Sequence, residues 1–358
     1  MEYTNCWLQY EKISDANHKG IKLYAPMESA IISNAVKELT VAFDLLYGRQ
    51  LEASFGGYNT ENDSREAKII LRLEPEFKLG REGFSIDCHD GSCVVTAQTD
   101  TGLLYGVFAL IRNIRLQKVE DFDKWSLALE QKPSNPIRML DHWDNMDGSI
   151  ERGYSGNSFF FEKDEIIINE RTRAYARLAA SVGINAVAIN NVNVRGAATW
   201  LISDRYYDKL KCLSEIFDSY GIKLYLSINF AAPIEMGGLD CSDPCDERVK
   251  AWWKDKAKEI WQRLPGFGGF LVKADSEGRP GPFTYGRSHA DGANMLAEAV
   301  APYGGLVIWR CFVYNCQQDW RDLKTDRARA SYDNFMPLDG KFADNVILQI
   351  KNGPMDFQ

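Results

Sequence analysis

The sequence predicts an α/β fold in which a small N-terminal α/β domain is followed by a (β/α)8 TIM barrel, with about six of its βα units present. Three observations predict this fold. Residues 1–130 mix strand-like runs with one clear helix. After the segment 133–136, which contains two prolines, the pattern changes to strand, loop and helix in repetition. Each later apolar strand ends at a polar residue, as strands do at the active-site face of such barrels.

The first domain is expected to be noncatalytic, because none of its residues gathers into a site pattern. Runs 67–73 and 93–97 read as strands. In residues 98–115 the apolar side chains recur at helical spacing, and Asp100 or Thr101 is the expected N-cap. The apolar face of this helix, which we expect to cover the sheet, consists of Leu103, Val107, Leu110 and Ile114.

Residues 131–358 are expected to form the catalytic barrel, truncated at its C-terminal end. Helical stretches such as 171–182 and 249–263 separate the strands and are long enough for right-handed crossovers. An open six-stranded sheet would leave bare edges and an uncovered apolar interior, so we expect the chain to be the N-terminal portion of a longer protein. The expected strands are 137–140, 185–189, 223–228, 269–272, 306–309 and 346–350.

The charge balance argues against a polyanionic partner. The 42 basic and 50 acidic residues leave a net charge of -8, and the pI is about 5.3. A protein that holds nucleic acid through phosphate contacts needs an excess of cations, so we expect no nucleic-acid partner. The N-terminus has no basic stretch followed by an apolar one, and no window approaches the length of a membrane span. We therefore expect a cytoplasmic protein without a membrane partner.

The cysteines and histidines do not form a metal-binding pattern. The four histidines are far apart and form no HExxH motif, so we expect no metal and no cofactor. Most of the eight cysteines are expected to be reduced core or loop residues. The close pairs that lack the doubled CxxC spacing of a zinc site are Cys88/Cys93, Cys241/Cys245 and Cys311/Cys316.

Some polar residues near the later strand ends are given a structural role. His142 and His289 are expected to be hydrogen-bonded structural histidines rather than catalytic ones. Asp291 and Asn294 are expected to cap a helix that begins near Ala293.

Lys273 and Glu277 follow the apolar run 268–272 and lead into a Gly/Pro loop, as catalytic side chains of barrels do. For an arbitrary strand end, a solvated charge pair in a turn is the commoner explanation. Other strand ends supply matching groups, however. Two carboxylates suit the acid and the base of glycoside hydrolysis, and the cations suit a sugar carboxylate. The candidate site residues are Trp143, Lys273, Glu277, Arg310, Lys351 and Asp356.

At these residues the sequence resembles the α-glucuronidases of glycoside hydrolase family 67. The resemblance runs through residues 130–358, and the N-terminal domain is similar in kind. Asp141 departs from the asparagine expected before His-Trp-Asp-Asn, and Leu323 stands where a basic residue is more usual. The segments that carry the resemblance are DHWDNMDGSIERGYSG (141–156), VKADSEGRPGPFTYGRSHADGAN (272–294), WRCFVYNCQQDWRDLKTDRA (309–328) and QIKNGPMDFQ (349–358).

The resemblance implies a glycoside hydrolase of xylan degradation. It would remove glucuronic acid, or its 4-O-methyl ether, from the 2-position of the terminal xylose of xylo-oligosaccharides, with inversion. Glu277 matches the general acid, and Asp356 matches one of two carboxylates that serve as the base. The residues that match groups holding the sugar are Lys273, Arg310 and Lys351, which bind its hydroxyls and carboxylate, and Trp143, a pocket wall.

The resemblance also implies a second base glutamate on a later strand and dimerisation through a C-terminal helical domain, both expected beyond Gln358. Without that glutamate, the alternative is a noncatalytic fragment that binds a sugar acid. Another alternative is a retaining barrel glycosidase of the hexosaminidase type, which would carry adjacent Asp and Glu at the fourth strand. Here Ser276 separates Asp275 from Glu277, which disfavours that reading.

Overall fold

The computed structural model describes residues 6–14, 20–56, 67–275, 278–311 and 327–350. The chain forms two compact units. Unit 1 comprises Met1–Arg138, Asn169–Asn185 and Ile216–Ile222, and unit 2 comprises Met139–Ile168, Ala186–Glu215 and Lys223–Gln358. Helix α4 (Glu170–Ser181) belongs to unit 1, although barrel strands precede and follow it in the sequence.

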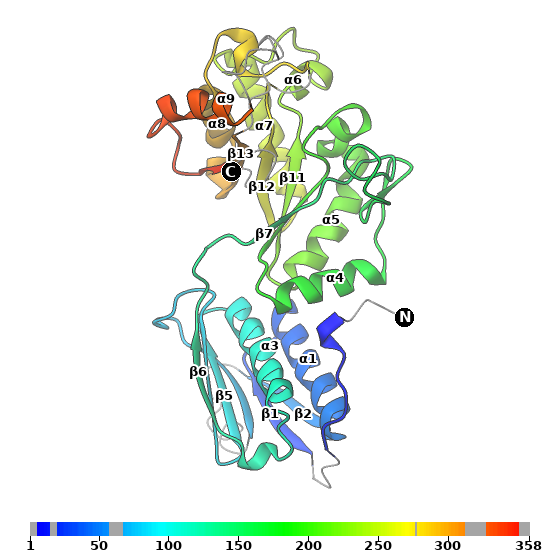
Figure 1. The fold of residues 1–358 in the computed structure, drawn as a ribbon, viewed down its shortest axis with the longest axis vertical. Helices are drawn as coiled ribbons and strands as arrows, with labels where there is room; N and C mark the ends of the chain where they lie inside the picture. The colour runs from blue at the N-terminus through cyan, green and yellow to red at the C-terminus, as the bar shows by residue number, and fades with distance from the viewer. Residues whose placement is uncertain (1–5, 15–19, 57–66, 276–277, 312–326, 351–358) are drawn as a thin grey trace. The chain divides into compact units, whose positions relative to one another are not determined.

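Unit 1 is built on a six-stranded mixed sheet with the order β2-β1-β3-β5-β4-β6. The strands β2, β1, β3 and β5 are parallel neighbours, whereas β4 pairs antiparallel with both β5 and β6. Helices α1 and α3 lie side by side on one face of this sheet (Figure 1). The elements are β1 (Ile21–Ala25), α1 (Ala30–Tyr47), β2 (Leu51–Phe55), β3 (Ile69–Leu73), β4 (Phe84–His89), β5 (Ser92–Ala97), α3 (Asp100–Leu116) and β6 (Leu127–Gln131).

The helix predicted in residues 98–115 is α3, and its predicted apolar face is buried in full: Leu103, Val107, Leu110 and Ile114 are each 0% exposed. The predicted N-cap is wrong by one or two residues. Thr99 is the cap, because its backbone is extended and its hydroxyl accepts a hydrogen bond from the Gly102 N–H at 3.3 Å.

Cys88 and Cys93 form a disulfide, which their spacing alone gives no reason to expect. They lie directly opposite each other in the β4–β5 hairpin, and this register brings the two sulfurs together across the ladder. The described cysteines that lie outside this disulfide are Cys6, Cys212, Cys241, Cys245 and Cys311.

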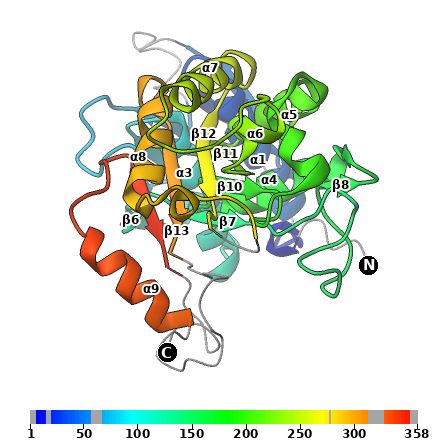
Figure 2. The same ribbon diagram turned by 90° about the horizontal axis from the view of Figure 1, so that it is seen from above.

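Unit 2 contains the predicted barrel strands as a curled, six-stranded parallel sheet with the order β14-β13-β12-β11-β10-β7. The predicted fold class, an N-terminal domain followed by part of a TIM barrel, is confirmed. Figure 2 shows α7 and α8 on the outside of this sheet. The strands are β7 (Met139–Asp141), β10 (Ala186–Ile189), β11 (Lys223–Ile228), β12 (Phe267–Val272), β13 (Leu306–Arg310) and β14 (Val346–Gln349).

Strand β12 is buried along its whole length and depends on glycine for its pairing with β13. Gly269 has a φ of 144°, and a Cβ built there would lie 1.9 Å from the Leu306 carbonyl oxygen. Only glycine allows the two backbones to approach this closely. On the outer side, Phe270 packs on Trp253 of α7, with ring centroids 5.9 Å apart.

The helices of unit 2 begin at clear caps. Helix α8 begins at His289, with Ser288 as its N-cap, rather than near Ala293 as predicted. Asp291 does take part in the cap, but Asn294 lies inside the helix and bonds to the backbone at residues 341 and 343. The remaining elements are β8 (Phe161–Glu162), β9 (Glu165–Ile166), α5 (Asp204–Asp218), α6 (Ala232–Glu235), α7 (Glu247–Arg263), α8 (His289–Val300) and α9 (Arg327–Phe335).

Within the described ranges, no helix combines the length and the apolar composition that crossing a bilayer requires.

Candidate active site

The carboxyl ends of the unit 2 strands carry the described candidate residues. Trp143 lies two residues after β7, Lys273 follows β12 directly, and Arg310 is the last residue of β13. Parallel neighbouring strands present these ends along one edge of the sheet, so the three side chains belong to the same face of the barrel. The candidates that lie outside the described residues are Glu277, Lys351 and Asp356.

Arg310 and Trp143 are the centre of a cluster that joins both edges of the sheet. The guanidinium carbon of Arg310 lies 4.9 Å from the centroid of the Trp143 ring, over its face. Asp141 Oδ2 accepts a hydrogen bond from Trp143 Nε1 at 3.2 Å and lies 3.7 Å from Arg310 Nη1. Gln349 Nε2 lies 3.5 Å from Asp141 Oδ2, and Gln349 Oε1 lies 3.4 Å from Arg310 Nη1. We call Asp141, Trp143, Arg310 and Gln349 the mouth cluster.

Two members of the mouth cluster were not among the predicted site residues. Asp141 ends β7 and Gln349 ends β14, so both stand at the strand ends that the pattern identifies. The position of Gln349 could have been noticed in the sequence, because Gln349 immediately precedes the last residue of the predicted strand 346–350. Its uncharged amide, however, gave no chemical reason to select it as a site residue.

Lys273 is bound by Asn193, which lies in the loop after β10. Its Nζ donates to Asn193 Oδ1 at 2.7 Å, and the residue is only 9% exposed. Asn193 also lines a cavity of about 820 Å³ between the loops that follow β7 and β10. An ammonium bound to a residue that lines such a cavity suits an anionic or hydroxyl-rich ligand. The cavity is lined by Asn145, Met146, Asp147, Ser149, Glu151, Arg152, Gly153, Asp164, Asn190, Asn191, Asn193 and residues 195–198.

The loop after β12 is tied at its two ends through Asp275. The Asp275 backbone has a φ of 52°, and Asp275 Oδ2 accepts a hydrogen bond from the Phe283 N–H at 3.1 Å. A Cβ at Gly281 would lie 2.4 Å from the Asp275 carboxyl carbon, so glycine is needed there. Burial raises the pKa of Asp275 to about 6, although hydrogen bonds from the Phe283 and Thr284 N–H groups oppose that shift.

Asp144 fixes the loop after β7 through hydrogen bonds and is only 2% exposed. Its Oδ2 accepts hydrogen bonds from Ser158 Oγ at 2.5 Å and from the N–H groups of Phe159 and Phe160 at 2.5 and 3.2 Å. Burial alone raises the pKa of this carboxyl, but the hydrogen bonds from His142, Ser158 and the two N–H groups outweigh burial and lower it. Asp144 is therefore a structural carboxylate, ionised at neutral pH.

His289 supports β13 from outside the mouth cluster. Trp309 Nε1 donates to His289 Nδ1 at 3.2 Å, and His289 stacks on the ring of Phe335 with centroids 4.6 Å apart. Complete burial lowers the pKa of His289 to about 3, so the ring is neutral at neutral pH. Because Trp309 precedes Arg310, this contact helps to orient the strand end that carries the guanidinium.

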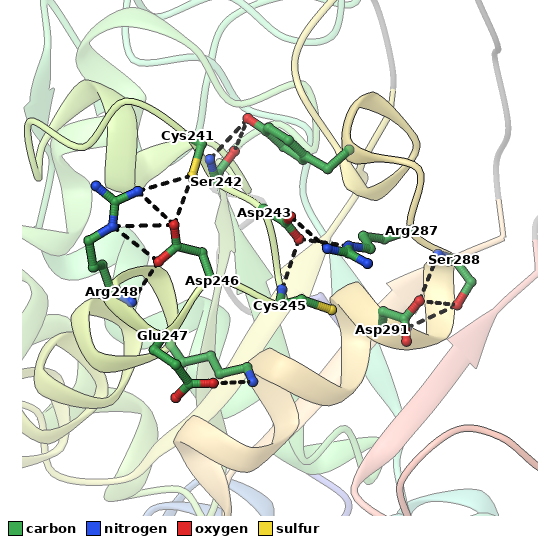
Figure 3. Close-up of polar contacts among 12 residues, drawn as sticks. Cys241, Ser242, Asp243, Cys245, Asp246, Glu247, Arg248, Arg287, Ser288 and Asp291 are labelled. Atoms are coloured by element: carbon green, nitrogen blue, oxygen red, sulfur yellow. Dashed lines mark hydrogen bonds and ion pairs between the residues drawn. The ribbon is translucent and has the colours of Figure 1, made fainter.

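A polar network fixes the loop between β11 and α7 against the segment before α8 (Figure 3). Asp243 receives two hydrogen bonds from Arg287, at 3.0 and 3.1 Å, and Tyr285 Oη accepts one from the Ser242 N–H at 2.9 Å. Arg248 bonds to Asp246 at the start of α7. These contacts make the rim of the barrel mouth around β11 and β12 a connected structure rather than a set of separate loops.

Among the described residues, no group of three or more His, Cys, Asp or Glu side chains could hold a metal ion. The groups that the mouth offers are an aromatic face, a guanidinium, an ammonium and carboxyls of differing proton affinity. Such a set can bind a sugar ring on the aromatic face and an acidic substituent by charge.

The chain matches known protein families over most of its length. Residues 116–358 match the family model described as "Glycosyl hydrolase family 67 middle domain". Residues 6–110 match the one described as "Glycosyl hydrolase family 67 N-terminus".

Curated proteins named as alpha-glucuronidases are similar over most of the chain. Alpha-glucuronidase A of Emericella nidulans is 39% identical over 379 residues, covering 98% of this chain and 43% of that protein. The alpha-glucuronidase of Hypocrea jecorina is 37% identical over 382 residues, covering 99% of this chain and 44% of that protein. The chain thus spans less than half the length of these curated relatives.

Solved structures share the fold at low sequence identity. The chitobiase of Flavobacterium johnsoniae has a TM-score of 0.55 at 15% identity, covering 95% of this chain and 57% of that one. The beta-N-acetylhexosaminidase of Bacteroides fragilis has a TM-score of 0.54 at 13% identity, covering 94% of this chain and 66% of that one. At such identities the likeness shows the fold alone.

Proposed function

The chain belongs to glycosyl hydrolase family 67, and we propose that it works as the N-terminal and central part of an inverting α-glucuronidase. Its substrate would be a xylo-oligosaccharide that carries α-1,2-linked glucuronic acid or the 4-O-methyl ether of that sugar. The similarity to alpha-glucuronidases over nearly the whole chain supports the glucuronidase activity.

The observation that carries the substrate proposal is the stacking of Arg310 over Trp143 at 4.9 Å. Arg310 is 6% exposed, so its charge acts in a poorly hydrated place, where a charge-assisted hydrogen bond to a carboxylate is strong. The guanidinium fork can hold both oxygens of a uronic carboxylate, while Lys273 supplies a second cation.

In this proposal Glu277 protonates the oxygen of the departing xylose, and Asp356 acts as one of the carboxylates that draw a proton from the attacking water. The water attacks the anomeric carbon from the face opposite the leaving group, so the bond to xylose breaks as the bond to water forms and the configuration inverts. Both residues lie outside the described ranges, and their roles rest on the family pattern.

A noncatalytic role in binding a sugar acid is the second candidate, because the cations of Arg310 and Lys273 can hold an anionic sugar without any hydrolysis. A retaining mechanism of the hexosaminidase type is disfavoured by Ser276, which interrupts the Asp-Glu pair that this mechanism uses. The shared fold with hexosaminidases does not bear on the mechanism.

The test is to follow glucuronoxylo-oligosaccharides by NMR in the presence of the protein that carries this chain. Release of glucuronic acid first as the β-anomer is the expected result, and first release of the α-anomer would contradict inversion. Glu277→Gln should abolish most of the release, whereas Glu76→Gln, an exposed glutamate of unit 1, should not. Binding of glucuronate without any release would favour the binding fragment.

Location and assembly remain predictions. We propose a cytoplasmic location, although the Cys88–Cys93 disulfide is of a kind more usual in oxidising compartments. We also propose that the whole protein is a homodimer, as the family resemblance implies. Thiol counting in protein isolated under alkylating conditions tests the first proposal, and sedimentation tests the second.

A further inference from the structure

Asp141 is an unusual member of the mouth cluster because its two carboxyl oxygens have different surroundings. Oδ2 faces the N–H groups of Trp143 and Gln349, at 3.2 and 3.5 Å. Oδ1 is buried and has no hydrogen-bond partner among the residues that the structure describes. The side chain as a whole is 16% exposed. A buried carboxyl oxygen without a partner is costly, so a ligand is expected to satisfy it.

The cation beside Asp141 does not pair with it tightly. Arg310 Nη1 lies 3.7 Å from Oδ2, which is longer than a charge-assisted hydrogen bond. Among the described residues, the other titratable neighbour of Asp141 is His142 of the same loop. Its uncharged neighbours there are Gln349 of β14, Trp143 and Ala188, its partner in β10. Burial raises the pKa of Asp141, and the contacts with Trp143, Arg310, Gln349 and His142 oppose the shift without cancelling it.

The position of a proton on Asp141 follows from these contacts. Because Oδ2 already accepts from N–H donors, a proton on the neutral carboxyl belongs on Oδ1. Asp141 ends β7 at the barrel mouth, and the guanidinium of Arg310 and the ring of Trp143 lie beside its other oxygen, Oδ2. The acceptor that this set of groups suits is an anionic oxygen, because donors converge on it from both Asp141 and Arg310.

We propose that Asp141 is a specificity-determining residue that binds the carboxylate of a uronic acid sugar as a neutral acid, donating Oδ1–H beside Arg310. This inference rests on the proposed function and names how the same site recognises its anionic substrate. In the absence of the sugar, the ionised form of Asp141 is stabilised by Arg310. When the sugar binds, Asp141 takes up one proton from solvent, and the guanidinium is shared with the sugar carboxylate.

The pH dependence has a definite sign. Below the raised pKa of Asp141 the carboxyl is already neutral, so the sugar acid binds without proton uptake. Above the raised pKa, binding of the sugar acid must add a proton to Asp141. Each further pH unit should therefore weaken the affinity for glucuronate by up to about tenfold. An ionised Asp141 would instead place two carboxylates around one guanidinium, which repel each other.

Isothermal titration with glucuronate as the probe tests the inference, using the protein that carries the whole chain from about pH 4 to about pH 8, a range that spans the ordinary carboxyl pKa and the shift that burial produces. Buffers of different ionisation enthalpy report the protons taken up. We expect uptake approaching one proton per glucuronate at the upper end for the wild type, and none for Asp141→Asn. Asp255→Asn, an exposed aspartate on α7, should behave as the wild type does.

A second measurement keeps the inference testable if Asp141→Asn does not fold. Infrared difference spectra of the wild type should show a protonated carboxyl band appearing when glucuronate is added above the raised pKa. Equal proton uptake in the wild type and Asp141→Asn, or no new carboxyl band in the wild type, would overturn the role of Asp141 while leaving the proposed function intact. Failure of the wild type to bind glucuronate at any pH would instead contradict both proposals.

Asp141→Asn also restores the asparagine expected from the family pattern at this position. A pH-independent affinity in that variant would therefore show that the titration belongs to this chain's own substitution and not to the rest of the mouth cluster.

Discussion

Asp141 Oδ2 lies 3.5 Å from Gln349 Nε2, although the two residues are 208 positions apart and come from opposite edges of one sheet. A flat six-stranded sheet would keep its edge strands five strand spacings apart, about 24 Å at roughly 4.8 Å per spacing. The contact therefore requires the curl of the barrel. It brings the ends of β7 and β14 to the same mouth as Arg310, and the site depends on that curl.

Replacement of Arg310 tests the anchoring of the sugar acid. Arg310→Met keeps much of the side-chain volume but removes the charge, and loss of a charge-assisted hydrogen bond of about 1.5 to 3 kcal/mol should weaken glucuronate binding about 10- to 100-fold. Calorimetry with glucuronate and with glucose measures it. Arg72→Met, at an exposed position of β3, should leave both affinities as they are. Wild-type protein that binds glucose as well as glucuronate would contradict the anchoring role.

Asp275 should make the wild type more stable as the pH falls. Its folded pKa of about 6 lies above the ordinary value, so the folded state holds the proton more tightly than the unfolded state does. Stability relative to Asp275→Asn should therefore rise as the pH falls from about 7 to about 4, by about 1 to 3 kcal/mol. Urea unfolding of both proteins at several pH values measures the difference. A difference that does not change with pH would show that Asp275 titrates normally.

His289 should make the protein sensitive to acid in the opposite sense. The pKa of folded His289, about 3, is below the ordinary value. The contribution of the neutral ring to the free energy of unfolding is therefore complete at neutral pH and is lost as the pH falls from about 6.5 toward 3. His289→Phe should lose about 1 kcal/mol at neutral pH, because Trp309 Nε1 loses its acceptor. The variant should, however, show a flatter decline in melting temperature with acid. A parallel decline in the melting temperatures of both proteins would refute the lowered pKa of His289.

Gly269 should tolerate no side chain. In Gly269→Ala the new Cβ would meet the Leu306 carbonyl oxygen, which belongs to the backbone of β13 and cannot turn aside. We expect a loss of more than about 3 kcal/mol in the free energy of unfolding. Gly304→Ala is the matched control, since Gly304 also has a positive φ but has no atom within 4 Å of its Cβ position; it should cost about 1 kcal/mol. Similar losses in the two variants would mean that strand contact at Gly269 is not the cause.

The pattern of the sequence predicted the barrel strands well because buried parallel strands are short apolar runs that break at polar residues. The run 223–228 coincides with β11, and the other five predicted strands overlap observed ones. Helix starts were less predictable. Thr99 and Ser288 are the caps in place of the predicted residues, because several neighbouring polar side chains could each cap and only the local backbone selects one.

The sequence by itself determined the fold class, the family resemblance and the strand ends at which Trp143, Lys273 and Arg310 stand, because periodicity and local motifs are properties of neighbouring residues. The tertiary structure alone decided that Asp141 and Gln349 join Arg310, that Asn193 holds Lys273, and that burial gives Asp141 and Asp275 raised pKa values. Those properties arise from contacts between distant strands and from loss of solvent, which exist only after the sheet has curled.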